Sequence, residues 1–186
     1  MKCHLLPLTL ALGLGAFAGQ AVAEEYPTRP IAIVVPFATG GPTDTSARIV
    51  AEALTKRSGT SFIVQNVPGA GAVVGATKVA QSKPDGYTVL WGSGSSLAMT
   101  PHLNPNVKYD PITSFTPIGQ VVSQPFVLVV NPSLGTKTVA ELVEMAKAAP
   151  GKLNFASAGL GSSTHLVAEL FAAASHSKAT HVPYKG

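Results

Sequence analysis

The sequence holds few of the residues on which covalent or metal chemistry depends. It has one cysteine, Cys3, which lies in the N-terminal leader described below. The rest of the chain therefore contains no thiol, no disulfide and no cysteine metal ligand. The histidines His102, His176 and His181 show no metal-ligand spacing, and carboxylate partners for them are sparse. We therefore expect no metal site.

Charge is scarce as well. The chain has 13 Lys and Arg residues against 9 Asp and Glu residues, a formal charge of +4. Removing the leader takes away Lys2 and leaves 12 basic against 9 acidic residues, a charge of +3. The basic residues do not cluster and aromatic residues are not interleaved with them, so the pattern excludes a nucleic-acid partner. A mildly basic, solvated surface is the simpler interpretation, with an anion-attracting field as the alternative.

No apolar run reaches membrane-spanning length. The stretch from Leu5 to Phe17 is shorter than the roughly 20 residues that a helical span needs. It follows the positive start Met1-Lys2 and precedes Ala21-Val-Ala23, a small-x-small cleavage signature. We predict that residues 1–23 are a secretory signal peptide removed before Glu24, which places the mature protein in the periplasm. A retained membrane anchor is the competing interpretation.

Catalytic and cofactor motifs are missing or incomplete. No Gly-x-Ser-x-Gly elbow occurs, and Gly159-Leu-Gly-Ser-Ser163 lacks the lysine of a phosphate loop. The segment Gly69-Ala-Gly-Ala-Val-Val-Gly75 imitates a dinucleotide fingerprint, but its last spacing is one residue too long and the later acidic residue is absent. A close-packed turn is favoured there. We therefore expect no cofactor and no enzyme, although His165 beside a glycine-rich turn leaves a ligand or base role open.

What the sequence does contain is an alternation of short apolar runs and helical patterns. Such an alternation predicts an α/β protein with parallel sheets and helices on their faces. The predicted strands are Ile31–Pro36, Phe62–Asn66, Thr88–Gly92, Phe126–Asn131, Leu153–Ala156 and His181–Tyr184. The predicted helices are Asp44–Arg57, Val73–Ser82, Val139–Ala148 and His165–Ser175.

A stretch with four prolines, residues 93–117, interrupts the alternation. We interpret it as the passage between two lobes, residues 24–105 and residues 106–186. A long functional loop inside one domain is the alternative. The sequence ends after a strand signal with nothing to close the second lobe, so we expect that lobe to be incomplete.

Two glycine-rich turns are the leading candidates for a ligand site. Each carries the chain from an apolar strand into a helix N-terminus, where unpaired N–H groups and the helix dipole suit an anion. The predicted ligand-binding residues are Phe37, Ala38, Gly40, Gly41, Thr43, Asp44, Ser157, Ala158, Gly159, Ser162, Ser163 and Thr164. For Asp44, support of the helix N-terminus and direct contact with a ligand both remain open, because a carboxylate would repel an anionic ligand.

Read in order, several motifs of the chain resemble those of the Bug family, the periplasmic substrate-binding receptors of tripartite tricarboxylate transporters. The resemblance runs from Tyr26 to Gly186. Its motifs are Tyr26-Pro-Thr-Arg-Pro-Ile31, Val35-Pro-Phe-Ala-Thr-Gly-Gly-Pro-Thr-Asp44, Asn66-Val-Pro-Gly-Ala-Gly71, Lys83-Pro-Asp-Gly-Tyr-Thr88, Val130-Asn-Pro132, Pro150-Gly-Lys-Leu-Asn154, Thr164-His-Leu166 and His181-Val-Pro-Tyr-Lys-Gly186.

The resemblance implies a two-lobed fold of the periplasmic-binding-protein type, whose turns after two strands grip a carboxylate. It implies a monomeric receptor that captures a small organic carboxylate between the lobes and delivers it to membrane permease subunits. It also implies a longer chain that returns to the first lobe. A carboxylate-sensing module that feeds a regulator, and a secreted hydrolase or isomerase using His165, are the alternatives. The sequence leaves the identity of the carboxylate open.

Overall fold

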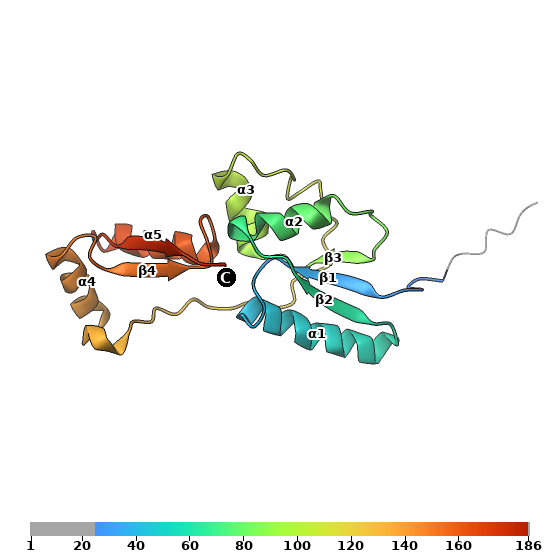
Figure 1. Cartoon of the computed structure of the whole chain (residues 1–186), viewed down its shortest axis with the longest axis horizontal. Helices are drawn as coiled ribbons and strands as arrows, with labels where there is room; N and C mark the ends of the chain where they lie inside the picture. The colour runs from blue at the N-terminus through green and yellow to red at the C-terminus, as the bar shows by residue number, and fades with distance from the viewer. Residues whose placement is uncertain (1–24, 186) are drawn as a thin grey trace, which may run out of the picture.

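The computed structural model describes residues 25–185, and the predicted signal peptide lies outside the described residues (Figure 1). The chain forms two parallel sheets, each flanked by helices, which confirms the predicted α/β class. No helix within residues 25–185 combines the length and the apolar character needed to cross a bilayer.

The first lobe is built on a three-stranded sheet in the order β2-β1-β3. Strand β1 (Ile31–Val35) lies at its centre, parallel to β2 (Phe62–Asn66) and to β3 (Thr88–Leu90). Helices α1 (Pro42–Ser58) and α2 (Val73–Ala80) cover opposite faces of this sheet (Figure 1). Because both faces are covered, β1 is buried along almost its whole length, as expected for a central parallel strand.

The hydrophobic core of this lobe lies between β1 and α1. It combines strand residues with small residues of the helix, which let the two backbones approach closely. Its buried members are Ile33, Val35, Phe37, Ala47, Ala51 and Ala72. Helix α1 begins two residues before its predicted start because Pro42 is suited to the first turn of a helix, and Gly59 ends it in a left-handed conformation.

The second lobe has a two-stranded parallel sheet of β4 (Asn154–Ser157) and β5 (Thr180–Pro183), joined through helix α5 (Ser163–Ala174). Helix α4 (Val139–Ala148) precedes them. A capping box begins α4: Thr138 Oγ1 accepts from the Glu141 amide, and the Glu141 carboxylate accepts from the Thr138 amide.

Between the lobes the chain forms a π-helical turn, η2 (Ser95–Met99), a short helix, α3 (Thr100–Leu103), and a long irregular passage that ends at η3 (Pro132–Leu134). The predicted strand Phe126–Asn131 is wrong. This segment pairs with no strand among the described residues, and Val127 and Val129 are 76% and 81% exposed. Its valines suit a strand by propensity, but a strand forms only where a partner supplies the ladder.

Candidate ligand-binding site

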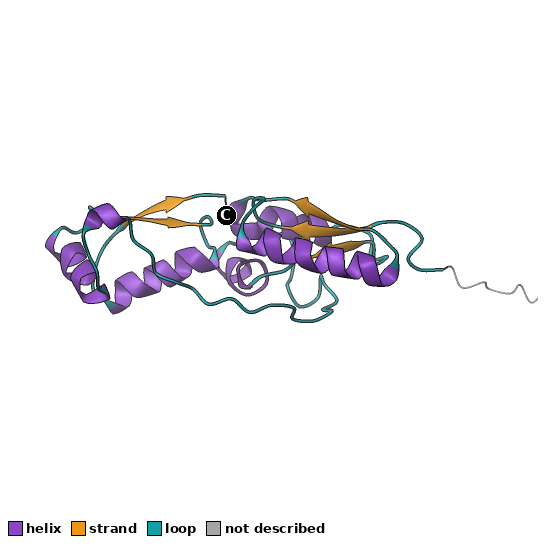
Figure 2. Cartoon of the chain, turned by 90° about the horizontal axis from the view of Figure 1, so that it is seen from below, coloured by secondary structure: helices purple, strands orange, loops and turns teal. Residues whose placement is uncertain are grey.

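The carboxyl ends of all five strands point toward the middle of the molecule, where the two lobes meet (Figures 1 and 2). In parallel α/β sheets, ligands bind outside this edge. A cavity of about 200 Å³ lies there. It is lined by the segments that follow β2, β4 and β5, namely Gly69–Gly71, Ala158–Leu160 and Pro183–Lys185. Lys185 is the cationic residue of this lining, and no acidic residue is part of it.

The turn after β2 has an unusual backbone. Ala70, Gly71 and Ala72 follow one another at positive φ angles of 49°, 62° and 82°. Residues other than glycine rarely adopt this region, and such strain persists only where the surroundings hold it. A Cβ atom on Gly71 would lie 2.5 Å from the Leu160 carbonyl oxygen, so the backbones of the two lobes touch at this point.

Several backbone N–H groups of the cavity lining have no acceptor among the described residues. The amides of Ala70, Gly71 and Leu160 donate to no group within residues 25–185. Gly71 is buried, whereas Ala70 and Leu160 are exposed. A buried amide normally has a partner, in the protein or in a bound ligand or water, so the Gly71 amide is the one that lacks an expected partner. Together with Lys185, these donors give the cavity the character of an anion site.

The turn from Ser157 to Thr164 uses its hydroxyl groups to hold its own shape. Ser162 Oγ accepts from the His165 amide (3.3 Å) and thereby caps α5, and its side chain is 1% exposed. Thr164 Oγ1 accepts from the Ala158 amide (2.9 Å), and Ser157 Oγ accepts from the Gly159 amide (3.1 Å). Of the residues predicted in this turn, Ala158 and Gly159 line the cavity.

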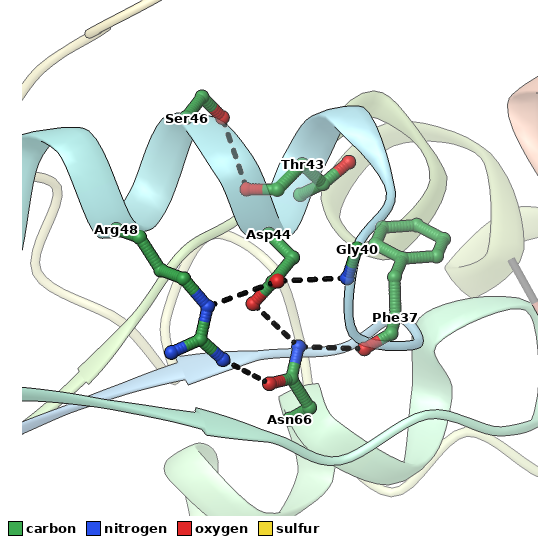
Figure 3. Close-up of polar contacts among 7 residues, drawn as sticks. All are labelled: Phe37, Gly40, Thr43, Asp44, Ser46, Arg48 and Asn66. Carbon is green, nitrogen blue, oxygen red and sulfur yellow. Dashed lines mark hydrogen bonds and ion pairs between the residues drawn. The ribbon is translucent and has the colours of Figure 1, made fainter.

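The turn from Phe37 to Asp44 is fixed by a polar network (Figure 3). The Asp44 carboxylate is 2% exposed and accepts from the Gly40 amide (2.8 Å), Arg48 Nε (3.0 Å) and Asn66 Nδ2 (2.9 Å). Asn66, at the end of β2, also donates to the Phe37 carbonyl (3.1 Å). The pKa of Asp44 is lowered to about 2, chiefly by the hydrogen bond from Arg48 and to a smaller extent by the other contacts. The carboxylate is therefore ionised and directed at the protein's own donors.

The other predicted residues of this turn do not line the small cavity. Phe37 is buried in the core, Ala38 and Thr43 are half-buried, and Gly41 is the N-terminal cap of α1. Gly40 is exposed with a φ of 88°, a conformation that favours glycine. The turn lies at the same sheet edge as the cavity, after β1.

The histidines form a stack instead of a metal site. His165 and His181 lie face to face with ring centroids 4.0 Å apart, and Phe155 stacks on His181 at 4.9 Å. His165 Nδ1 accepts from the Gly161 amide (3.2 Å), and His165 Nε2 lies 3.6 Å from a Glu169 carboxylate oxygen. Within the described residues no group of three potential metal ligands occurs. His165 thus supports the glycine-rich turn.

Sequence reasoning missed the turn at Gly71 as part of the cavity, and it missed Ser95 and Thr100, whose hydroxyl groups bond residues of the second lobe. The sequence places residues 93–117 in a passage between lobes and favours a close-packed turn at residues 69–75. Close packing holds for Gly75, where a Cβ atom would lie 2.8 Å from Pro36 Cβ. One signal was present: these segments follow the second and third strands of a predicted parallel sheet. Turns at the carboxyl ends of neighbouring parallel strands share one edge.

Comparison with known proteins places the chain in a family. The profile of the tripartite tricarboxylate transporter family receptors matches residues 46–186. BugT of Bordetella pertussis is 38% identical over 183 residues, which cover 98% of this chain and 56% of BugT. The chain thus spans about half the length of the curated relatives that it matches.

Solved structures agree with this assignment. A periplasmic transporter is 37% identical with a TM-score of 0.85, and a protein of R. palustris solved with adipate is 38% identical with a TM-score of 0.84. MatC of Rhodopseudomonas palustris, solved with malate, is 33% identical with a TM-score of 0.81. Each match covers 87% of this chain and 54% or 55% of the other. The matched proteins are receptors and periplasmic binding proteins, and this chain belongs to the tripartite tricarboxylate transporter family of receptors.

Proposed function

We propose that this chain forms the carboxylate-binding region of a periplasmic receptor, which captures a small organic acid between its lobes and presents it to a membrane permease. One observation carries the proposal: the cavity is lined by Ala70, Gly71 and Leu160, whose amides donate to no group within residues 25–185, and by Lys185, with no acidic residue in the lining. Backbone donors of this kind hold a carboxylate without a change in side-chain protonation.

The relatives support a dicarboxylate as the ligand class. Adipate and malate, found with two of the related structures, each carry two carboxylates on a short chain. The turn at Gly40 and Gly41 is the proposed further wall, because it lies at the same sheet edge and presents exposed backbone. Asp44 would position this turn without touching the ligand, since its oxygens already accept three hydrogen bonds.

The family supports the location and the partner. The predicted leader would direct the chain to the periplasm, where membrane permease subunits would receive the ligand. Intact-mass measurement after periplasmic extraction tests the location. The mass is expected to match a chain that begins at Glu24. Recovery of the protein in membranes, with a mass that includes Lys2, would contradict the proposed location.

Calorimetric titration tests the site itself. Adipate and malate are titrated into the full chain, with adipamide, the neutral diamide of adipate, as the control ligand. We expect at least one diacid to bind and adipamide to bind at least about tenfold more weakly, because it lacks the charge that the amides and Lys185 recognise.

Matched variants locate the binding. Lys185→Gln should weaken diacid binding by about 3- to 10-fold, the value of one charge-assisted contact at a partly exposed position. Lys152→Gln, an exposed lysine of the same lobe outside the cavity lining, should leave binding unchanged. Equal binding of adipamide, or equal effects of the two substitutions, would contradict an anion site in this cavity.

A further inference from the structure

The two walls of the cavity are tied together by a segment that belongs to neither of the glycine-rich turns predicted as the ligand site. Ser95 and Thr100 lie at the two ends of the π-helical turn η2, after β3 in the first lobe. Their side chains are 3% and 1% exposed. Burial of a hydroxyl group costs free energy unless the group is hydrogen-bonded, so the hydrogen-bond partners of Ser95 and Thr100 explain why these side chains are buried.

Ser95 reaches the second lobe. Its Oγ accepts from the Ser163 amide at 2.9 Å and lies 2.8 Å from Ser163 Oγ. Ser163 is the first residue of α5, whose N-terminal amides lack partners inside the helix. One such amide is therefore capped by a residue 68 positions earlier in the chain, from the other lobe.

Thr100 joins both cavity walls. Its Oγ1 lies 3.1 Å from the Gly71 carbonyl of the first lobe and 3.2 Å from the Gly161 carbonyl of the second. A hydroxyl has one proton, so the two carbonyls share it in a three-centre bond. The contact at Gly71 lies inside the strained turn of Ala70 to Ala72. Thr100 thus holds the strained turn and sets its distance from the turn at Gly161.

The π-helical geometry explains how both hydroxyls serve one interface. The Thr100 amide donates to the Ser95 carbonyl, five residues back. In an α-helix, residues five apart point about 140° away from each other, because each residue turns the helix by about 100°. The wider π turn brings them closer to one side. Such turns are rare and are frequently found at functional sites.

We propose that Ser95 and Thr100 are positioning residues of the interlobe site: they hold the α5 N-terminus and the turn at Gly161 against the turn at Gly71, and so set the spacing of the amides that face the ligand. This inference rests on the proposed function for its effect on affinity. Its effect on lobe spacing is independent of any ligand.

A distance measurement tests the lobe spacing. Spin labels are placed on α1 and α4 through Arg57→Cys and Lys147→Cys in a Cys3→Ser background, both exposed positions. Pulsed electron resonance on the full chain should give a single narrow distance distribution. Thr100→Val, which keeps the side-chain shape, should broaden or shift it, and Ser95→Ala should do the same. Thr100→Ser, which retains the hydroxyl, should restore it, and Thr45→Val, which removes an exposed hydroxyl from α1, should leave it unchanged.

Titration with adipate and malate provides the second readout. Thr100→Val and Ser95→Ala should each lower the affinity for the diacid that binds the parent chain by about 3- to 10-fold. Unchanged distance distributions in both variants would overturn the inference, whatever the binding result. If neither diacid binds the parent chain while the distributions change, the positioning role stands and the proposed function fails. If far-UV circular dichroism shows that Thr100→Val does not fold, Ser95→Ala alone decides.

Discussion

The two lobes have similar elements but are stabilised differently. In the first lobe, Val34, Val35 and Ala47 are completely buried between the sheet and its helices. In the part of the second lobe from η3 to β5, the buried apolar residues are Leu142 and Ala146 of α4, and α5 has none. The order of the second lobe therefore depends more on hydrogen bonds at its inner end, near the cavity.

This difference bears on function because ligand-gripping segments are drawn from the less stable parts of a protein. The glycine-rich turn of the second lobe stands on a two-stranded sheet, and an isolated pair of strands is marginal by itself. The turn of the first lobe stands on a packed sheet. We infer that the second lobe is the adaptable wall of the cavity and the first lobe the rigid wall.

The largest expected effect comes from the core of the first lobe. Val35→Ala leaves a cavity at a fully buried strand position and should lower the free energy of unfolding by about 2–3 kcal/mol. Leu142→Ala, at the best-buried large apolar residue of α4, should cost about 1–2 kcal/mol because that site can collapse toward solvent. Urea denaturation followed by circular dichroism measures both.

Hydrogen exchange localises these effects. Val35→Ala should raise exchange in β1, β2 and α1, whereas Leu142→Ala should raise it in α4 alone. Ile118→Ala, at a side chain that is 85% exposed, is the control and should change nothing. A larger loss from Leu142→Ala than from Val35→Ala would reverse the assignment of the rigid and adaptable walls.

The second effect in size concerns the network at Asp44. Asp44→Asn removes the negative charge of the carboxylate that accepts hydrogen bonds from Arg48 and two other donors. The substitution should lower the free energy of unfolding by about 1–3 kcal/mol near neutral pH. The folded pKa is about 2, below the ordinary value of 3.8. The stabilisation is therefore present above about pH 4 and is lost as the pH falls toward the folded pKa.

An acid titration of stability tests this sign. The parent chain should lose stability between about pH 4 and pH 2 more steeply than Asp44→Asn, which has no carboxylate to protonate there. Glu25→Gln, at an exposed residue near the start of the described chain, is the control and should keep the parent slope. Parallel curves for the parent and Asp44→Asn would mean that the Asp44 carboxylate does not stabilise the first lobe.

Particular residues show how far the sequence alone could go. The apolar run from Ile31 to Val35 marked the central strand, and Thr138 with Glu141 marked the start of α4, because burial and capping leave local patterns. The run from Phe126 to Asn131 carries the same kind of pattern, yet it lies exposed without a strand partner. Pairing is a property of the whole fold, which a local pattern does not contain.

The site shows the same division. Both glycine-rich turns were predicted from strand–glycine–helix order, and both lie at the edge where the strands end. The hydroxyls of Ser162 and Thr164 looked like ligand donors, but they bond their own turn. The hydrogen bonds of Ser95 with Ser163 and of Thr100 with Gly161 join residues that are 68 and 61 positions apart, and no local spacing in the sequence predicts them.

A smaller effect is expected at the cap of α5. Ser162→Ala removes the acceptor of the His165 amide and should cost about 1 kcal/mol, the usual value of an N-terminal cap. Thr138→Ala, the corresponding change at α4, should cost a similar amount. If the second lobe is the adaptable wall, exchange after Ser162→Ala should rise in α5 and in the turn at Gly161 but stay unchanged in α1. Equal increases in both lobes would argue against separate stabilities.

The smallest expected effect is a pH dependence confined to the second lobe. Burial first, and then the neighbouring His165, lower the pKa of His181 from its ordinary value of 6.5, while Glu169 opposes this shift. The folded chain therefore favours the neutral ring, whose Nε2 lies 2.6 Å from Ser157 Oγ. As the pH falls below 6.5, the unfolded chain takes up the proton first, so stability decreases until the folded pKa is passed. Exchange in β4 and β5 should rise from about pH 7 to about pH 5, after correction for the intrinsic rate.

His181→Asn should flatten this dependence, whereas His102→Asn, at an exposed position on α3, should keep it. The same pH dependence in β1, or its persistence after His181→Asn, would mean that the two lobes open as one unit and that His181 does not distinguish them.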